Sequence, residues 1–220
     1  MRIVRLVNRG YVFHASGVIE FPKIEAVVGK FAQTYGTDAD PSEERRRHRH
    51  GEARVRLVLW PEKTGAGFVL LATEGKGGIH QREAVQDVRR PQERLRVRQY
   101  ELLKLPRRRD QPRWSWRTVH DRHEQLMQQA IRVARYEHPR SAEQFIASQV
   151  ITRPGLHGIR HQTRLMLSAM KVARRKAGFP PLRLPDHIAW VRGTFRKCEP
   201  LDQWLATERP KRTLKRVGDP

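Results

Sequence analysis

The sequence lacks three features that define large classes of proteins. Cys198 is the only cysteine among 220 residues, so the chain can form no internal disulfide and no zinc site built on several cysteines. It contains no run of eighteen apolar residues, so no membrane-spanning helix is expected. The first ten residues, MRIVRLVNRG, contain three arginines and are not expected to act as a signal peptide. A bacterial-type cytoplasm or nucleoid is the expected location, with no membrane partner.

Acidic residues are also scarce. The chain has 23 of them against 45 lysines and arginines, which gives a net charge of +22 and a pI near 11.4. The excess is uneven: residues 1–40 carry five basic and four acidic groups, residues 41–117 twenty and ten, and residues 118–220 twenty and nine. Such self-repulsion is best tolerated when a polyanion neutralises it, which predicts a nucleic-acid partner. The alternative is a basic surface that faces only solvent.

The common catalytic signatures are missing as well. The sequence has no G-x-x-x-x-G-K-[ST] phosphate loop and no paired carboxylates for two-metal cleavage. His120 with His123, and His157 with His161, have the spacing of metal ligands, but neither pair has a clear third ligand. We therefore expect no bound metal and no cofactor.

A hairpin from Arg54 to Glu74 organises the first half of the chain. Its two apolar runs, 55–60 and 68–73, are rich in residues that favour strands, and Pro61, Gly65 and Gly67 lie between them. Apolar and basic residues alternate along the first run, which predicts a sheet with one face on the core and one face free. Arg54 and Arg56 are expected on the free face.

The remaining elements of this half predict an α+β fold. The order of strand, helix, strand, strand, helix, strand is typical of a ferredoxin-like βαββαβ domain, with a four-stranded sheet and two helices on one face. Before the hairpin we expect a strand over 11–20, a helix over 21–35 and a polar loop over 37–51. After it we expect a short helix over 79–88 and a fourth strand over 95–105.

The second half has a helical period. Residues 114–117 could add a short strand that pairs with the preceding one, and helices are predicted over 118–136, from 141 onward and over 158–177. The sequence therefore divides into a nucleic-acid-binding domain over 1–113, a basic α-helical domain over 114–206 and a basic tail over 207–220.

Three basic segments are the expected nucleic-acid contacts. The loop Arg45–His50 has no apolar residue and is expected to be mobile until it folds onto RNA. On the last predicted helix, one narrow sector carries four cations, and the neighbouring sector is apolar and includes Ile159, Met166 and Met170. Such a sector could contact phosphates, read bases in a major groove or face water. The expected contact residues are Arg45, Arg46, Arg47, Arg49, Arg54, Arg56, Arg107, Arg108, Arg109, Arg160, Arg164, Lys171 and Arg175.

Metal-free RNA cleavage is the one reaction for which suitable residue types are present. A base would remove the proton of the 2′-hydroxyl, an acid would protonate the leaving oxygen, and cations would stabilise the phosphorane. The candidate catalytic residues are His14, His48, His50, His80 and Tyr100.

A ferredoxin-like domain, a very basic helical extension and scattered histidines together resemble the CRISPR repeat-RNA processing proteins of the RAMP type. The arginine content is most similar to the version found in plasmid-borne type IV systems. The glycine-rich loop of that family has its nearest counterpart in Gly75-Lys76-Gly77-Gly78, earlier in the chain than the family places it. The resemblance implies an RNA-binding protein that cuts or caps a repeat hairpin and stays in the ribonucleoprotein.

Two other classes of protein fit the same composition. One is a non-catalytic DNA-binding protein for replication or partition of a plasmid or integrative element. The other is a structural protein associated with the ribosome. Binding to hairpin RNA and to duplex DNA of equal length discriminates the first two hypotheses.

Overall fold

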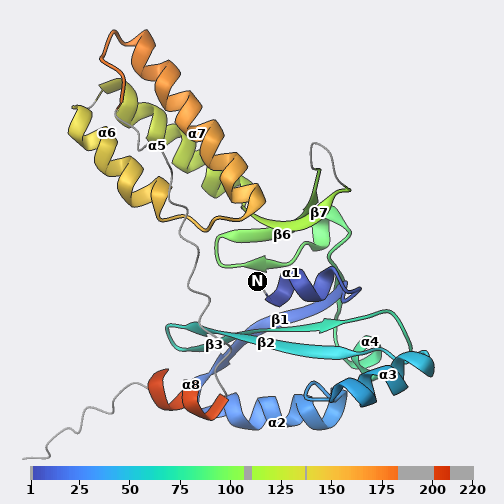
Figure 1. The fold of residues 1–220 in the computed structure, drawn as a ribbon. Helices are drawn as coiled ribbons and strands as arrows, with labels where there is room; N and C mark the ends of the chain where they lie inside the picture. The colour runs from blue at the N-terminus through green and yellow to red at the C-terminus, as the bar shows by residue number, and fades with distance from the viewer. Residues whose placement is uncertain (1, 107–110, 137, 183–200, 209–220) are drawn as a thin grey trace, which may run out of the picture.

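The computed structural model describes residues 2–106, 111–136, 138–182 and 201–208. These residues form helices and antiparallel strands, as the α+β prediction requires. Figure 1 shows successive layers, in which helices cover one face of a first sheet, a second sheet faces its other side, and a group of helices lies beyond the second sheet. Within the described residues, no helix is both long and apolar enough to cross a membrane.

The predicted hairpin forms one side of the first sheet. Its strands, β2 (Val55–Glu62) and β3 (Gly65–Ala72), pair in register along their whole length. β3 also pairs with β1 (Phe13–Glu20), and β1 pairs with the two-residue strand β4 (Gln86–Asp87). The strand order is β2-β3-β1-β4, and all three pairings are antiparallel.

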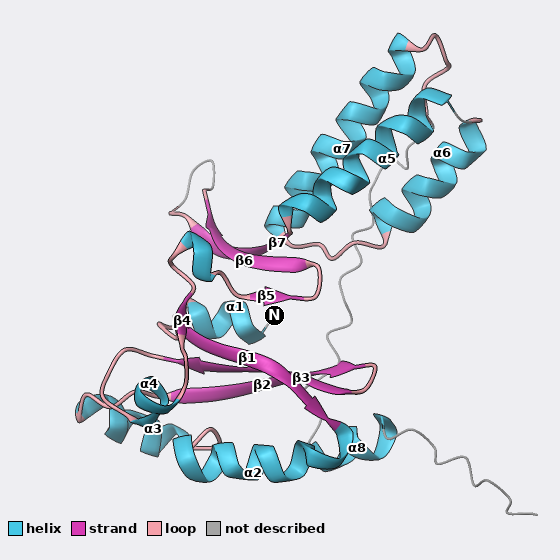
Figure 2. Cartoon of the chain, turned by 180° about the vertical axis from the view of Figure 1, so that it is seen from behind, coloured by secondary structure: helices cyan, strands magenta, loops and turns pink. Residues whose placement is uncertain are grey.

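One face of this sheet packs on helices. A 3₁₀ turn, Phe21–Lys23, leads into α2 (Ile24–Tyr35), and Gly36 ends that helix in the left-handed conformation, as its position predicts. The short helix α4 (Gly78–Arg82) and the later helix α8 (Leu201–Glu208) complete the layer, which Figure 2 shows from behind.

The other face is covered, so the prediction of a free face is wrong. Helix α1 (Arg2–Val7), which we did not predict, places its apolar side against this face. The second sheet adds further core residues from β6 (Tyr100–Leu105) and β7 (Arg113–Thr118). Exposed apolar strand faces are costly, and this arrangement removes Val69 and Leu71 of β3 from water completely.

The predicted fourth strand belongs to this second sheet, which is a correction to the expected topology. The run over 95–105 forms β5 (Arg96–Val97) and β6, which pair with each other and not with β1. β6 then pairs with β7, so strand pairing spans the expected domain boundary between residues 113 and 114. The predicted helix over 79–88 is limited to α4, because β4 and the 3₁₀ turn Pro91–Glu93 follow it.

The three predicted helices of the second half are present. They are α5 (His120–Tyr136), α6 (Pro139–Phe145) with a π-helical continuation over Ile146–Ile151, and α7 (His157–Lys176). They share one apolar core, and α7 also rests on β7.

Gly158 allows α7 to approach β7 closely. A Cβ at this position would lie 2.6 Å from the carbonyl oxygen of Trp116 and 2.8 Å from Cδ1 of Leu105. The Gln162 side chain joins the same two elements, because it accepts from the backbone N–H of Thr118 at 2.8 Å and donates to the Thr118 carbonyl at 2.9 Å. The helical unit is therefore fixed to the second sheet by close packing and by paired hydrogen bonds.

We expect Gly158→Ala to destabilise the protein by about 1–3 kcal/mol, because the new methyl group must displace backbone. Gly29→Ala is the matched control, since nothing lies within 4 Å of a Cβ there and alanine favours the interior of α2 by up to about 1 kcal/mol. Urea denaturation should therefore move the midpoint in opposite directions for the two variants. A raised midpoint for Gly158→Ala would contradict the close packing.

Candidate nucleic-acid interface

A strongly basic concavity is lined by residues of α1, of the start of β2 and of a further helix, α3 (Pro41–Arg49). It has a volume of about 1020 Å³, and we call it the arginine cavity. Five arginines line it, with a single carboxylate among them. The lining residues are Arg2, Val4, Arg5, Leu6, Asn8, Arg9, Tyr11, Glu44, Arg54 and Arg56.

Helix α1 and the turn after it supply three of these arginines. Ile3, Leu6 and Val7 of the helix are buried in the core, so Arg2 and Arg5 are left on its exposed side, and Arg9 is exposed in the turn that follows. Neither the Arg5 nor the Arg9 side chain forms a hydrogen bond or ion pair with any residue that the structure describes, and both guanidinium groups are available to an anion.

The segment expected to be a mobile loop is helix α3 (Pro41–Arg49), which is a second correction. The Asp40 carboxylate caps it by accepting from the N–H groups of Ser42 and Glu43 at 2.7 and 2.9 Å, and Pro41 occupies the first turn. Acidic residues in the first turn and basic residues in the last complement the helix dipole.

Glu44 of α3 links two other residues of the cavity lining, Tyr11 and Arg56. One of its oxygens, Oε1, accepts from the Tyr11 hydroxyl at 2.6 Å and lies 2.9 Å from Nε of Arg56. Burial alone would raise the pKa of Glu44, but these two contacts outweigh it and leave that pKa below its ordinary value. Burial, followed by the bond to Glu44, raises the pKa of Tyr11 to about 12. Arg56 also donates to the Thr37 carbonyl at 3.2 Å, so its charge is largely satisfied within the protein.

Unlike Arg56, the Arg54 side chain contacts an aromatic ring and forms no ion pair within the described part of the chain. Its guanidinium carbon lies 5.4 Å from the centre of the Tyr11 ring, and its buried Nε has no partner among the described residues. The side chain makes no ion pair with a described acidic group. With Arg5 and Arg9, it gives the cavity three cations that form no ion pair with a described acidic residue.

The four arginines of α3 divide into two kinds. Arg46 and Arg47 pair with Glu43 at 2.7 and 2.9 Å, and Arg47 also donates to the Tyr35 carbonyl at 2.9 Å. Arg45 and Arg49 are exposed and pair with no described residue. The helix therefore offers two accessible cations in place of the flexible cluster that the sequence predicted.

A second basic surface runs along α7. The predicted packing of this helix is confirmed, because Ile159, Met166 and Met170 of the apolar sector are fully buried. The four cations on the neighbouring sector are exposed and pair with no described residue. We call them the α7 stripe: Arg160, Arg164, Lys171 and Arg175.

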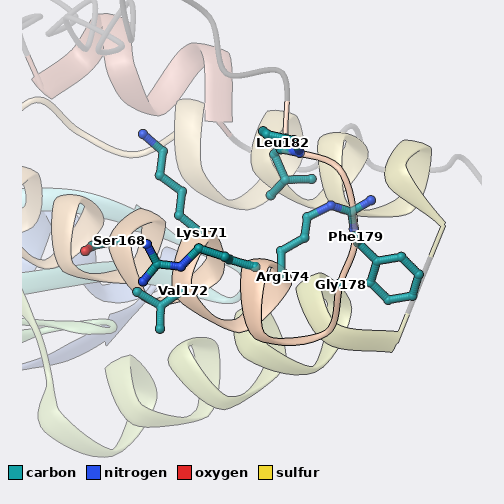
Figure 3. Close-up of a pocket in the computed structure, with 9 residues that line it drawn as sticks. Ser168, Lys171, Val172, Arg174, Gly178, Phe179 and Leu182 are labelled. Atoms are coloured by element: carbon teal, nitrogen blue, oxygen red, sulfur yellow. The ribbon is translucent and has the colours of Figure 1, made fainter.

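The stripe ends beside a cavity of about 770 Å³ at the C-terminus of α7, which Figure 3 shows. Lys171 and Arg175 of α7 line it, together with Gly178, Phe179 and Leu182, which follow the helix.

The candidate catalytic residues are not brought together. His14 is only 2% exposed, its Nε2 lies 2.9 Å from the Glu93 carbonyl oxygen, and burial lowers its pKa. The His80 ring contacts the Thr73 carbonyl and Phe13, and the Tyr100 hydroxyl accepts from Gln99.

The two remaining candidates, His48 and His50, lie at the exposed end of α3. No hydrogen bond or ring contact joins any two of the five candidates.

Arg107, Arg108 and Arg109 lie outside the described residues. Within the described part of the chain, no group of three or more histidine, cysteine, aspartate or glutamate side chains could hold a metal ion. Comparison of the chain with protein-family models, curated proteins and solved structures found no match.

Proposed function

We propose that this protein binds a structured RNA, such as a CRISPR repeat hairpin, and remains bound to it in a ribonucleoprotein. The arginine cavity carries the proposal. Arg5, Arg9 and Arg54 line it without an ion pair to a described acidic residue, and the one carboxylate in the lining is already engaged by Tyr11 and Arg56. Uncompensated cations of this kind favour phosphate.

The two basic surfaces differ in shape, and this favours a folded RNA over a uniform duplex. The arginine cavity is concave, whereas the α7 stripe is a row along a convex helix. A hairpin offers both a regular stem, whose phosphates can follow a row of cations, and unpaired nucleotides that can enter a concavity.

We also propose that β1, α2, β2, β3, α4 and β4 form a ferredoxin-like unit. The order β2-β3-β1-β4 and the placement of α2 and α4 against one face support this. The proposed function covers binding alone, because the five candidate catalytic side chains do not meet.

The decisive experiment compares a hairpin RNA with duplex DNA of equal length at several salt concentrations. We expect tighter binding to the RNA and a linear fall of log affinity with log salt, because each phosphate contact releases counterions. A flat salt dependence would overturn the electrostatic basis of the proposal.

The second candidate function is sequence-specific DNA binding. It is favoured by the exposed cationic face of α7, a 20-residue helix long enough to lie in a major groove. Tighter binding to the duplex DNA in the same experiment would select it.

A further inference from the structure

The C-terminal cap of α7 leaves the aromatic ring of Phe179 exposed. Gly178 adopts a left-handed conformation, with φ of +74°. The N–H of Phe179 donates to the Arg174 carbonyl at 3.2 Å, and that of Gly178 donates to the Arg175 carbonyl at 3.1 Å. This pair of bonds is a Schellman cap, which fixes the direction in which the chain leaves the helix. It leaves the large apolar Phe179 side chain 42% exposed.

The buried Arg174 side chain contacts this ring. It is only 1% exposed, and its Nε donates to the Pro180 carbonyl at 2.7 Å. Its Nη1 donates to the Ala134 carbonyl near the end of α5, at 3.3 Å, where a cation complements the helix dipole. The guanidinium carbon lies 5.1 Å from the centre of the Phe179 ring, and Figure 3 shows the Arg174 side chain extending toward that ring. Arg174 is thus a positioning residue for Phe179.

The Phe179 ring lies near the C-terminal end of the α7 stripe. Lys171 and Arg175 belong both to the α7 stripe and to the wall of the adjacent cavity. Arg174 leaves one nitrogen, Nη2, without a partner among the described residues. The volume of about 770 Å³ is in the range of sites for small molecules, and Val172, Phe179 and Leu182 make much of its wall apolar.

We propose that this cavity takes one unpaired nucleotide of the bound RNA, with its base stacked on Phe179 and its phosphates on Lys171 and Arg175. Aromatic side chains bind bases of any sequence through their faces, and neighbouring cations bind the backbone. In this arrangement the double-stranded stem of the RNA lies along the α7 stripe. The cavity then binds the single-stranded flank at the point where the flank leaves the stem. This inference rests on the proposed RNA-binding function.

The test uses two RNA hairpins with the same stem, one blunt and one with a short flank that contains 2-aminopurine. We expect the protein to bind the flanked RNA more tightly and to quench the 2-aminopurine fluorescence through stacking. Phe179→Ala should abolish the quenching and weaken binding of the flanked RNA by about 5- to 150-fold, the range for one stacked base. Phe179→Trp should keep both properties.

Two controls separate this inference from the proposed function. The blunt hairpin should bind Phe179→Ala as well as it binds the unaltered protein. Tyr136 is also an exposed aromatic residue beside an arginine, with 71% of its surface exposed, but it does not line the cavity. Tyr136→Ala should therefore change neither the quenching nor the binding of the flanked RNA. Normal quenching by Phe179→Ala would overturn the inference and leave RNA binding intact, whereas no binding of either hairpin would overturn RNA binding itself. Binding of free adenosine monophosphate at this site, with no effect of the flank, would also overturn the inference.

Discussion

Replacing Arg5, Arg9 and Arg54 together by glutamine should weaken RNA binding on the order of 100-fold at 0.1 M salt, because each lost phosphate contact removes roughly 0.7 to 0.9 from the salt slope. All three line the arginine cavity, and none forms an ion pair with a described acidic residue. Arg56 is left unchanged, since it holds Glu44 and the Thr37 carbonyl. Titration of a labelled hairpin at several salt concentrations measures both affinity and slope.

The control removes the same charge elsewhere. Lys30, Lys63 and Arg82 are exposed and lie outside both basic surfaces, so their joint replacement by glutamine lowers the net charge equally. We expect this control to lose affinity only slightly. Equal losses for the two triple variants would show that overall charge, and not the arginine cavity, attracts the RNA.

The cavity could be predicted only in part, because its residues come from separate parts of the chain. Arg54 and Arg56 were expected from the hairpin. Tyr11 and Glu44 were not, since their hydrogen bond joins positions 33 residues apart and no local pattern predicts it. A local signal for α1 was present, because Ile3, Leu6 and Val7 have helical spacing with arginines between them.

The sequence of the α3 helix also contains a local helix signal, although its high charge resembles that of a loop. Asp40 followed by Pro41, with acidic residues early and basic residues late, is the usual pattern of a capped helix. The run Arg45–His50 has no apolar residue to suggest a packed face, so it resembled a loop. Its order comes from capping, from the pairs with Glu43 and from contacts of Glu44 and Arg47 to other elements.

Strand identity was predictable, but strand partnership was less so. The hairpin, β1 and the pairing of β7 with the preceding strand follow from composition and turn residues. The run over 95–105 is apolar enough to pair in either sheet. Which strand it pairs with depends on the path of the chain between β4 and β5, and the local sequence does not determine that path. The two-residue strand β4 already occupies the edge beside β1, so β6 pairs instead with β7. By contrast, α7 is long and strongly periodic, so its packed and cationic sectors were predicted from local spacing, although the burial of Arg174 was not.

Replacing the whole α7 stripe, Arg160, Arg164, Lys171 and Arg175, by glutamine should weaken binding to every RNA sequence alike. All four side chains are exposed beside, and not within, the buried sector of α7, and glutamine keeps much of the helix propensity, so the fold should persist. Phosphate contacts carry no base information, so discrimination between sequences should be unchanged. Four lost contacts should make the slope of log affinity against log salt shallower by roughly 3.

The matched control removes four arginines from α5 and α6 of the same helical unit. Arg122, Arg132, Arg135 and Arg140 are exposed, and their replacement by glutamine gives the same net charge as the stripe variant. Circular dichroism and urea denaturation should show both variants folded, and only the stripe variant should show the shallower salt dependence. Loss of sequence discrimination with general affinity kept would instead make α7 a base-reading helix and favour the DNA-binding alternative. An unchanged slope would mean that the stripe faces only water, and other cations, such as those of the arginine cavity, would then have to carry the binding.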